Sequence, residues 1–177
     1  GVDYVGAGGT LTFPPDVTLL VLPVQVKGDR VLESDETFLV ISGDVLTDID
    51  LSAFVKAHRS TGAAGSIALK RVDDPVEFGI VITHEDGSIE RFLEKPTWGQ
   101  VFSDTINTGI YVFEPDIFDF IPDGRSVDFS SDVFPKLLAD HRPLYGPVAE
   151  GYWEDVGTLD AYLRAHKDVL DERLQLD

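Results

Sequence analysis

Seven residues decide the fold expected of this chain, the stretch FLVISGD at positions 38–44. The first four are continuously apolar, which is typical of a strand buried in a parallel sheet. The run stops at Ser-Gly-Asp, so the Asp44 carboxylate is expected at the C-terminal edge of that sheet, where ligands of open α/β sheets bind. A carboxylate there suits Mg²⁺, and Gly43 leaves room for a ligand to approach. Asp44 is equally compatible with a plain cap of the turn that follows.

Outward from this strand, the apolar periodicity predicts strands alternating with helices. Asp50 is expected to cap a helix that ends at Gly62, and Thr158 to cap a final amphipathic helix. Shorter helices are expected over residues 116–121 and from Ser130 or Ser131 onward. Further strands are expected over residues 66–72, 78–83, 88–93, 108–113 and 143–149, the second and third forming a hairpin. This order predicts an α/β three-layer sandwich around a mostly parallel, mixed sheet.

Residues 1–34 differ in composition and hydrophobic pattern from residues 35–177. Glycine is frequent before Thr10, and a β-branched and leucine run over residues 17–26 is interrupted by Pro23, so one or two strands are expected. We therefore divide the chain into an atypical N-terminal segment, residues 1–34, and one domain, residues 35–177. The chain has no methionine and begins at Gly1, which indicates a fragment or a processed product, with a fold truncated at its N-terminus.

Composition narrows the possible partners. The 177 residues are 43% hydrophobic, which suits one globular domain. Fourteen basic residues against 32 acidic ones give a net charge of −18, which disfavours nucleic acid and anionic membranes as partners. The absence of cysteine excludes disulfides and thiolate chemistry, and no apolar run approaches the roughly 18 residues of a membrane span. A cytoplasmic protein is expected, and any phosphate it handles requires local lysines, backbone N–H groups or a divalent cation.

Two acidic motifs could carry chemistry. The stretch YWEDVGT at positions 152–158 could supply Asp155 as a second carboxylate beside Asp44, or it could be an acidic helix start that the macrodipole favours. Glu94 and Lys95 precede Pro96. A lysine can bind phosphate and a glutamate can accept sugar hydroxyls, but the two could also form an exposed ion pair of little consequence.

A third motif, NTGIY at positions 107–111, places an amide and a glycine at a strand start. Asn107 could donate to and accept from a sugar ring, or it could be an ordinary turn residue. The four histidines do not favour catalysis, because two fall in amphipathic helices, one in a hairpin turn and one in a loop. No serine or acid is suggestively placed beside any of them for a catalytic triad.

In this order, the motifs resemble those of the nucleotidyltransferase family of sugar-nucleotide pyrophosphorylases. The similarity runs from about residue 35 to residue 177, and it looks closest to the bacterial mannose-1-phosphate guanylyltransferases. It is carried by GD at 43–44, FGIV at 78–81, EKP at 94–96, NTGIY at 107–111 and WEDVGT at 153–158. The resemblance implies a Rossmann-like fold and transfer of a nucleoside monophosphate from a nucleoside triphosphate to a sugar 1-phosphate, with GTP and mannose 1-phosphate favoured.

The resemblance also implies roles for matching residues. Asp44 and Asp155 would hold Mg²⁺ and, with Lys95, form the catalytic set. Lys95 would contact the sugar 1-phosphate and Glu94 the sugar hydroxyls. The substrate pocket would further include Gly43, Gly79, Asn107, Thr108 and Gly109. A homo-oligomer, or association with an intact family subunit, is compatible with this assignment.

The N-terminal segment departs from the family. Members open with a glycine loop, GxGTRL, followed by a Lys-Pro pair, whereas this chain has GAGGTL at 6–11 and LPV at 22–24, without the arginine or the lysine. About 30 residues, rather than many tens, separate that stretch from the Gly-Asp strand. Residues 1–5 could instead be the strand before the family's base-recognising turn, or residues 4–31 could imitate an appended hexapeptide β-helix. Two functions stay open: a nucleotidyltransferase, or a catalytically silent sugar-phosphate-binding or regulatory member.

Overall fold

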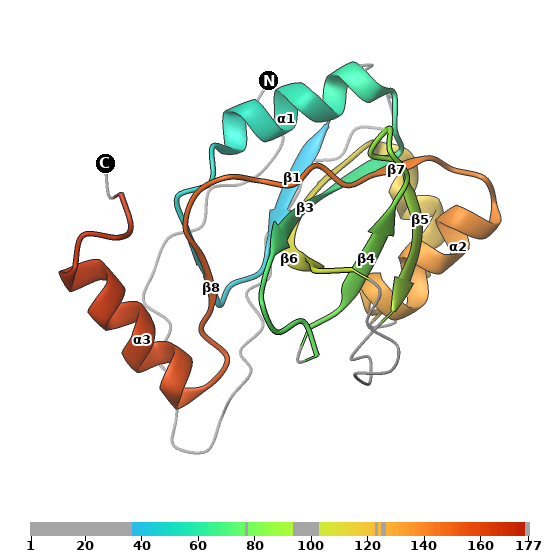
Figure 1. Ribbon diagram of the computed structural model, residues 1–177. Helices are drawn as coiled ribbons and strands as arrows, with labels where there is room; N and C mark the ends of the chain where they lie inside the picture. Colours follow the sequence, from blue (N-terminus) through green and yellow to red (C-terminus); the bar gives the residue numbers. More distant parts are fainter. Residues whose placement is uncertain (1–36, 77, 94–102, 123, 125–126, 176–177) are drawn as a thin grey trace. The chain divides into compact units, whose positions relative to one another are not determined.

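A mixed sheet of six strands forms the centre of the domain (Figure 1). The computed structural model describes residues 37–175 apart from 77, 94–102, 123 and 125–126, all within the compact unit Asp35–Asp177. The sheet contains β1 (Phe38–Ile41), β3 (Gly65–Arg71), β4 (Ile80–Thr83), β5 (Ile89–Leu93), β6 (Thr105–Phe113) and β7 (Leu144–Tyr145). Two further strands, β2 (Val45–Thr47) and β8 (Trp153–Asp155), pair with each other as a separate antiparallel ribbon. The strands expected in residues 1–34 lie outside the described residues.

The helices begin and end largely at the expected residues. They are α1 (Leu51–Thr61), α2 (Phe134–Ala139), α3 (Leu159–Leu170), the 3₁₀ helix η2 (Pro115–Phe120) and the π-helical turn η3 (Phe129–Val133). The Asp50 side chain accepts from the Ala53 N–H at the start of α1, which ends at Gly62 with a φ of 66°. Thr158 likewise accepts from the Ala161 N–H at the start of α3. The cap expected at Ser130 or Ser131 is instead Asp128, whose carboxylate accepts from the Ser131 N–H.

The sheet is mixed, as expected, but few of its hydrogen-bonded pairs are parallel. Among the described strands, β3 and β7 pair in parallel, whereas β6 is antiparallel to β1, β3 and β4, and β4 is antiparallel to β5. Four of the six strands (β1, β3, β4 and β7) therefore share a direction, and β6 lies reversed among them. A short apolar run in the sequence is typical of both parallel and antiparallel buried strands. The expected mostly parallel sheet therefore has more parallel pairs than the structure shows.

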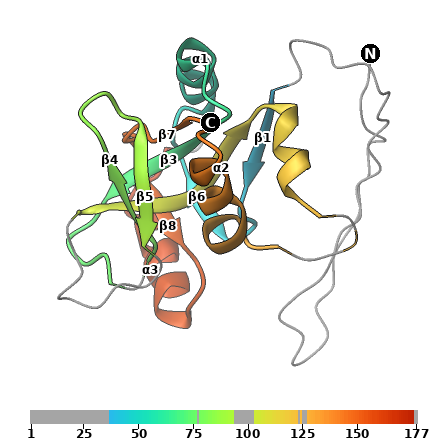
Figure 2. The ribbon, with the colours of Figure 1, turned by 90° about the vertical axis from the view of Figure 1, so that its right-hand side faces the viewer.

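Alternate residues of the central strands build a core on each face of the sheet. Ile67 and Phe113 pack with the helical segments of residues 115–139, whereas Ala68 and Val112 pack with Phe54 of α1. Successive strand residues point to opposite faces, so the same two strands supply both cores. Figure 2 faces the side that carries α2 and shows it beside β5. The expected three-layer sandwich is confirmed.

Three strands differ from expectation. β6 begins at Thr105 rather than at residue 108, so Asn107 and Gly109 lie within the strand and not at its start. β1 pairs only with β6 among the described residues, and its Leu39 and Ile41 side chains are 39% and 40% exposed. The strand expected over residues 143–149 is reduced to β7 and one isolated bridge between Leu69 and Val148. Within the described ranges, no helix is both long and apolar enough to cross a membrane.

Candidate functional site

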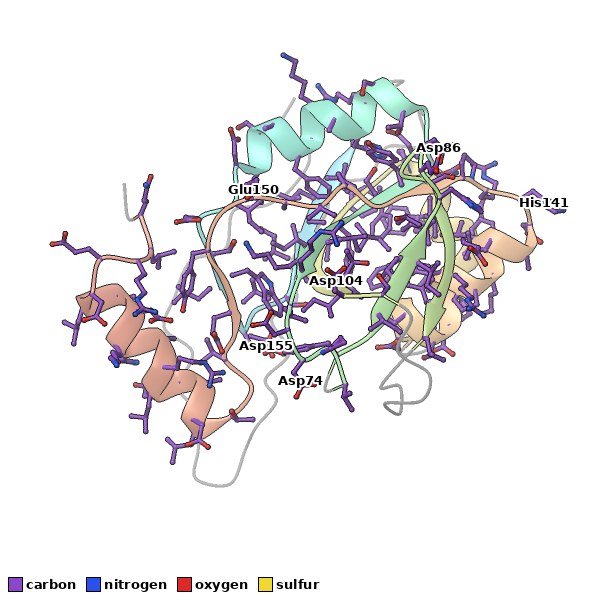
Figure 3. All side chains as sticks on the ribbon, in the orientation of Figure 1. Asp74, Asp86, Asp104, His141, Glu150 and Asp155 are labelled. Carbon is purple, nitrogen blue, oxygen red and sulfur yellow. The ribbon has the colours of Figure 1, made fainter. Side chains whose placement is uncertain are left out.

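The β2–β8 ribbon brings the two expected metal-binding residues, Asp44 and Asp155, side by side along the backbone. Asp155 ends β8 and lies opposite Val45, the first residue of β2. One step along, the Val156 N–H donates to the Asp44 carbonyl at 2.9 Å. Figure 3 shows Asp155 between the ribbon and the main sheet. Asp44 and Asp155 are 111 positions apart in the sequence. The antiparallel pairing of β2 with β8 therefore makes their backbones neighbours.

Six of the expected site residues line one pocket of about 380 Å³. They are Asp44, Gly79, Asn107, Thr108, Gly109 and Asp155. The remaining described lining residues are Ser42, Val45, Phe78, Tyr111, Asp128, Ser130 and Trp153. Three aspartates and several hydroxyl groups thus face a common space, and the described lining includes no lysine, arginine or histidine.

The surroundings of Asp155 disfavour the ionised form of its carboxyl group. Burial raises the pKa of its carboxyl above the ordinary value, and the nearby negative charges of Asp44 and Glu154 raise it further, while the Gly157 backbone N–H lowers it in part. Its Oδ1 is buried and has no hydrogen-bond partner among the described residues. A buried carboxylate oxygen without a donor costs free energy, which a bound cation would recover.

The pair therefore fits Mg²⁺. No group of three or more histidine, aspartate or glutamate side chains among the described residues could enclose a metal ion by itself. Magnesium rarely uses such a cage, and commonly takes one or two carboxylates together with water and phosphate oxygens. Asp44 and Asp155 would supply the protein's share of that set.

The Asn107 side chain supports the pocket wall. Its amide nitrogen donates to the Tyr111 hydroxyl at 3.1 Å and to Ser130 Oγ at 3.0 Å, and its carbonyl oxygen accepts from the Gly109 N–H at 3.0 Å. An amide has two N–H donors and two acceptor lone pairs, so a single lone pair stays available. Asn107 thus fixes the two hydroxyl groups and the following glycine more than it could bind a sugar directly.

The neighbouring residues of β6 contribute backbone rather than side chain. Thr108 is 1% exposed, and its hydroxyl donates to the Ala68 carbonyl. Gly109 has a φ of 75°, and its carbonyl accepts from the Ser42 N–H at 2.9 Å. A Cβ at Gly109 would come within 2.5 Å of Ser42 Oγ, so glycine is required both by conformation and by space. Gly79 directly precedes β4, and its carbonyl accepts a hydrogen bond from the Asn107 N–H of β6.

Three expected residues are not among the described lining of this pocket. Gly43 lines a second, mainly apolar hollow of about 560 Å³ between the ribbon and α3, which Asp44 and Val45 line as well. Glu94 and Lys95 lie outside the described residues, so their roles stay predictions. Sequence reasoning overlooked Asp128 and Ser130, because the segment between β6 and α2 brings them to the pocket without any local signal. Trp153 and Tyr111 stood inside recognised motifs but were not assigned to the site.

His58 contacts a serine and an acid that the sequence did not suggest. Its Nδ1 lies 2.8 Å from Ser66 Oγ and its Nε2 lies 3.0 Å from Glu114 Oε1. A nucleophilic triad also joins a serine, a histidine and an acid, but there Nε2 faces the serine and Nδ1 the acid, the reverse of this cluster. Ser66 is moreover 0% exposed, so no substrate can reach it. The three residues join α1 to β3 and to the end of β6, which is a structural role.

Known sequences place the chain among nucleotide-transferring proteins. A family model described as "Nucleotidyl transferase" matches residues 22–172, a match that starts inside the segment we set apart as atypical. A UTP–glucose-1-phosphate uridylyltransferase from Synechocystis is 40% identical over 143 residues, which is 80% of this chain and 37% of that protein. A mannose-1-phosphate guanylyltransferase from Mycobacterium tuberculosis is 42% identical over 141 residues, 77% of this chain and 38% of that protein. The chain thus spans less than two fifths of the length of these relatives.

Solved structures agree on the fold. A putative glucose-1-phosphate thymidylyltransferase from Bacillus anthracis superimposes with a TM-score of 0.65 at 24% identity, covering 80% of this chain and 56% of that one. An apo UDP-glucose pyrophosphorylase gives 0.64 at 22% identity, covering 78% and 56%. Since the family model covers most of this chain, including the carboxylate pair and the β6 motif, the chain belongs to the nucleotidyl transferase family, among the sugar-nucleotide pyrophosphorylases.

Proposed function

We propose that this chain acts in the transfer of a nucleoside monophosphate from a nucleoside triphosphate to a sugar 1-phosphate, with release of pyrophosphate. The observation that carries the proposal is the Asp44–Asp155 pair in the lining of a pocket that hydroxyl groups and backbone also line. One buried oxygen of Asp155 has no hydrogen-bond partner among the described residues. Relatives named UTP–glucose-1-phosphate uridylyltransferase and mannose-1-phosphate guanylyltransferase support this reaction class. Within it, we propose mannose 1-phosphate and GTP as the substrates.

The protein's own contribution is positioning and charge. Asp44 and Asp155 hold a Mg²⁺ ion, which neutralises charge on the phosphates when bound. Lys95 binds the phosphate of the sugar 1-phosphate, and Glu94 accepts from the sugar hydroxyls. The backbone at Gly79 and Gly109 closes the pocket against the sugar ring. An oxygen of the sugar phosphate then attacks the α-phosphorus in line, and pyrophosphate leaves.

One observation favours a second function. The glycine stretch GAGGTL at 6–11 lacks the arginine and the lysine that the family places beside the triphosphate. A chain without them would still bind a sugar phosphate through the pocket, and would serve as a silent binding or regulatory member. Both functions therefore require binding of the metal and the sugar phosphate, so a chain that binds neither has neither function. Turnover of substrate distinguishes the nucleotidyltransferase from the silent binding or regulatory member.

Binding is measured by titration calorimetry with Mn²⁺ as the metal probe and mannose 1-phosphate as the anion. Asp44→Asn and Asp155→Asn should each weaken Mn²⁺ binding by about 10-fold or more, because a ligand charge is lost. Asp86→Asn is the matched control, since Asp86 is an exposed hairpin aspartate hydrogen-bonded to Ser88 and lies well away from Asp155 in Figure 3. Equal affinities in all three variants would contradict the metal assignment.

Lys95→Ala tests the anion half of the site. The protein carries a net charge of −18, so a phosphate needs a local cation to bind. We expect the variant to lose about 10-fold in affinity for mannose 1-phosphate, as when one charge-assisted hydrogen bond is removed. Lys56→Ala, on α1, is the control, and its affinity should be that of the unaltered chain. An unchanged Lys95→Ala titration would remove Lys95 from the site.

A further inference from the structure

Trp153 connects the ribbon that carries the carboxylates to the main sheet. Its indole Nε1–H donates to the Thr108 carbonyl at 2.9 Å, and its ring meets Phe78 edge-on at 5.6 Å between centroids. Thr108 belongs to β6, whereas Trp153 belongs to β8, which forms no ladder with the six-stranded sheet among the described residues. The indole hydrogen bond therefore crosses from one sheet to the other.

The alternation of β8 links this hydrogen bond to Asp155. Residues two apart on a strand share a face, so Trp153 and Asp155 point the same way and both line the pocket. Glu154 points to the opposite side, where its carboxylate pairs with Arg164 of α3 at 2.6 Å. Fixing the indole thus fixes the direction in which the Asp155 carboxylate leaves the strand.

The segment that leads from β1 into β2, the other strand of the ribbon, also makes a hydrogen bond to β6. The Ser42 N–H donates to the Gly109 carbonyl at 2.9 Å, two residues before Asp44. Each carboxylate therefore follows, at a distance of two residues, a hydrogen bond to adjacent carbonyls of β6. Two like charges held side by side repel each other, so their spacing depends on such attachments rather than on mutual attraction.

We propose that Trp153 is a positioning residue: its indole N–H fastens the β2–β8 ribbon to β6 and so holds Asp155 beside Asp44 for a divalent cation. The statement about the cation rests on the proposed function, whereas the fastening does not. Hydrogen bonds that orient metal ligands commonly change metal affinity severalfold when they are removed.

Trp153→Phe removes the indole donor and keeps an aromatic ring against Phe78. Benzothienylalanine at position 153, which keeps the bicyclic shape and lacks the N–H, is a second variant for the same test. Thr47→Val is the matched control, because Thr47 Oγ1 donates to the Tyr152 carbonyl at 2.7 Å in the same ribbon but makes no bond to β6. Thermal unfolding followed by circular dichroism shows that each variant is folded before it is compared.

Two readouts decide the proposal. Amide hydrogen exchange at Val156, whose N–H donates to the Asp44 carbonyl, should accelerate about fivefold or more in both Trp153 variants and less than about twofold in Thr47→Val. The Kd for Mn²⁺ should rise about three- to tenfold in the Trp153 variants alone. Unchanged Val156 exchange in the Trp153 variants, or equal exchange in the control, would overturn the fastening. If the unaltered chain binds no Mn²⁺, the metal role in the proposed function fails, and Val156 exchange still decides the fastening.

Discussion

At the scale of single residues, Asp155 combines two opposing demands. Its position beside Asp44 suits a cation, but without one the same position buries a charge next to another charge of the same sign. Sites arranged for function commonly carry such local costs, which the rest of the fold must offset. The stability of the domain should therefore report on the site directly.

Asp155→Asn should stabilise the metal-free domain near neutral pH by about 0.5–1 kcal/mol, because it removes the buried charge while keeping the shape. A carboxyl whose pKa is raised by folding contributes most when protonated, and this contribution is lost as pH rises through the folded-state pKa. The advantage of the variant should therefore be absent below the ordinary carboxyl pKa of 3.8 and grow as pH rises. Urea unfolding at a series of pH values measures it.

The same pair of proteins provides a control. Millimolar Mg²⁺ should raise the midpoint of the unaltered chain and leave Asp155→Asn unchanged, since a ligand stabilises only the state that binds it. A variant less stable than the unaltered chain at pH 7 would contradict the electrostatic account.

Gly109 is the second residue with a specific expectation. Gly109→Ala adds a Cβ at a φ of 75° and places it within 2.5 Å of Ser42 Oγ. We expect a loss of about 2–3 kcal/mol in unfolding free energy, of which about 1 kcal/mol is the backbone conformation alone. Gly62→Ala isolates that backbone share, because Gly62 has a φ of 66° and open space around it. Equal losses in the two variants would show that Ser42 moves aside without cost.

At the scale of elements, the His58 cluster joins α1, β3 and the end of β6. His58→Leu should cost about 2–4 kcal/mol, because the buried Ser66 hydroxyl loses the only hydrogen-bond partner that the structure gives it. Glu114→Gln keeps a hydrogen-bond acceptor and is expected to cost less than about 1 kcal/mol. Denaturant unfolding compares them, and comparable losses would mean that the charge of Glu114, rather than the buried contacts, holds the three elements together.

Element boundaries were predictable where a single residue controls them. Asp50, Gly62 and Thr158 begin or end helices through their own backbone or side chain, so local sequence sufficed to place α1 and α3. The hairpin of β4 and β5 was equally local, since it depends on the tight turn at Gly87. In contrast, β2 is three residues long and exists through its pairing with β8 more than 100 positions later, which no local pattern encodes.

The site was predictable in part for the same reason. Asp44 and Asp155 stood out because each lies beside a strand end. Asn107 was expected at a strand start and lies inside β6, but the structure places all three residues around one pocket. Asp128 and Ser130 reach the pocket through the segment before α2, and Ser130 accepts one of the two hydrogen bonds that the Asn107 amide nitrogen donates. Such partners follow from tertiary packing and could not be read from spacing along the chain.

At the scale of the whole molecule, the question is whether the chain turns over substrate by itself. The triphosphate brings about four negative charges to a protein whose own net charge is −18. Arginine groups that hold transferring phosphates contribute about 10³-fold or more to the rate in enzymes that use them, and the stretch at 6–11 has none. We expect little or no pyrophosphate release from the chain alone.

The measurement follows pyrophosphate with Mg²⁺, several nucleoside triphosphates and either mannose or glucose 1-phosphate. Lys27 and Arg30 are the basic residues nearest after the glycine stretch, and their alanine variants test whether either replaces the missing cations. Turnover of about 1 s⁻¹ or more would contradict the silent alternative. Activity that disappears in one of those variants would identify the replacement.

The three aspartates of the pocket affect the order in which ligands bind. Asp44, Asp128 and Asp155 give the empty pocket a negative potential, which attracts cations and repels phosphate esters. The metal ion should therefore bind first, and phosphate-containing ligands should bind weakly until the metal ion is bound. In an equilibrium titration this appears as ordered rather than random binding, in which the apparent Kd of the sugar phosphate falls as free Mg²⁺ is raised.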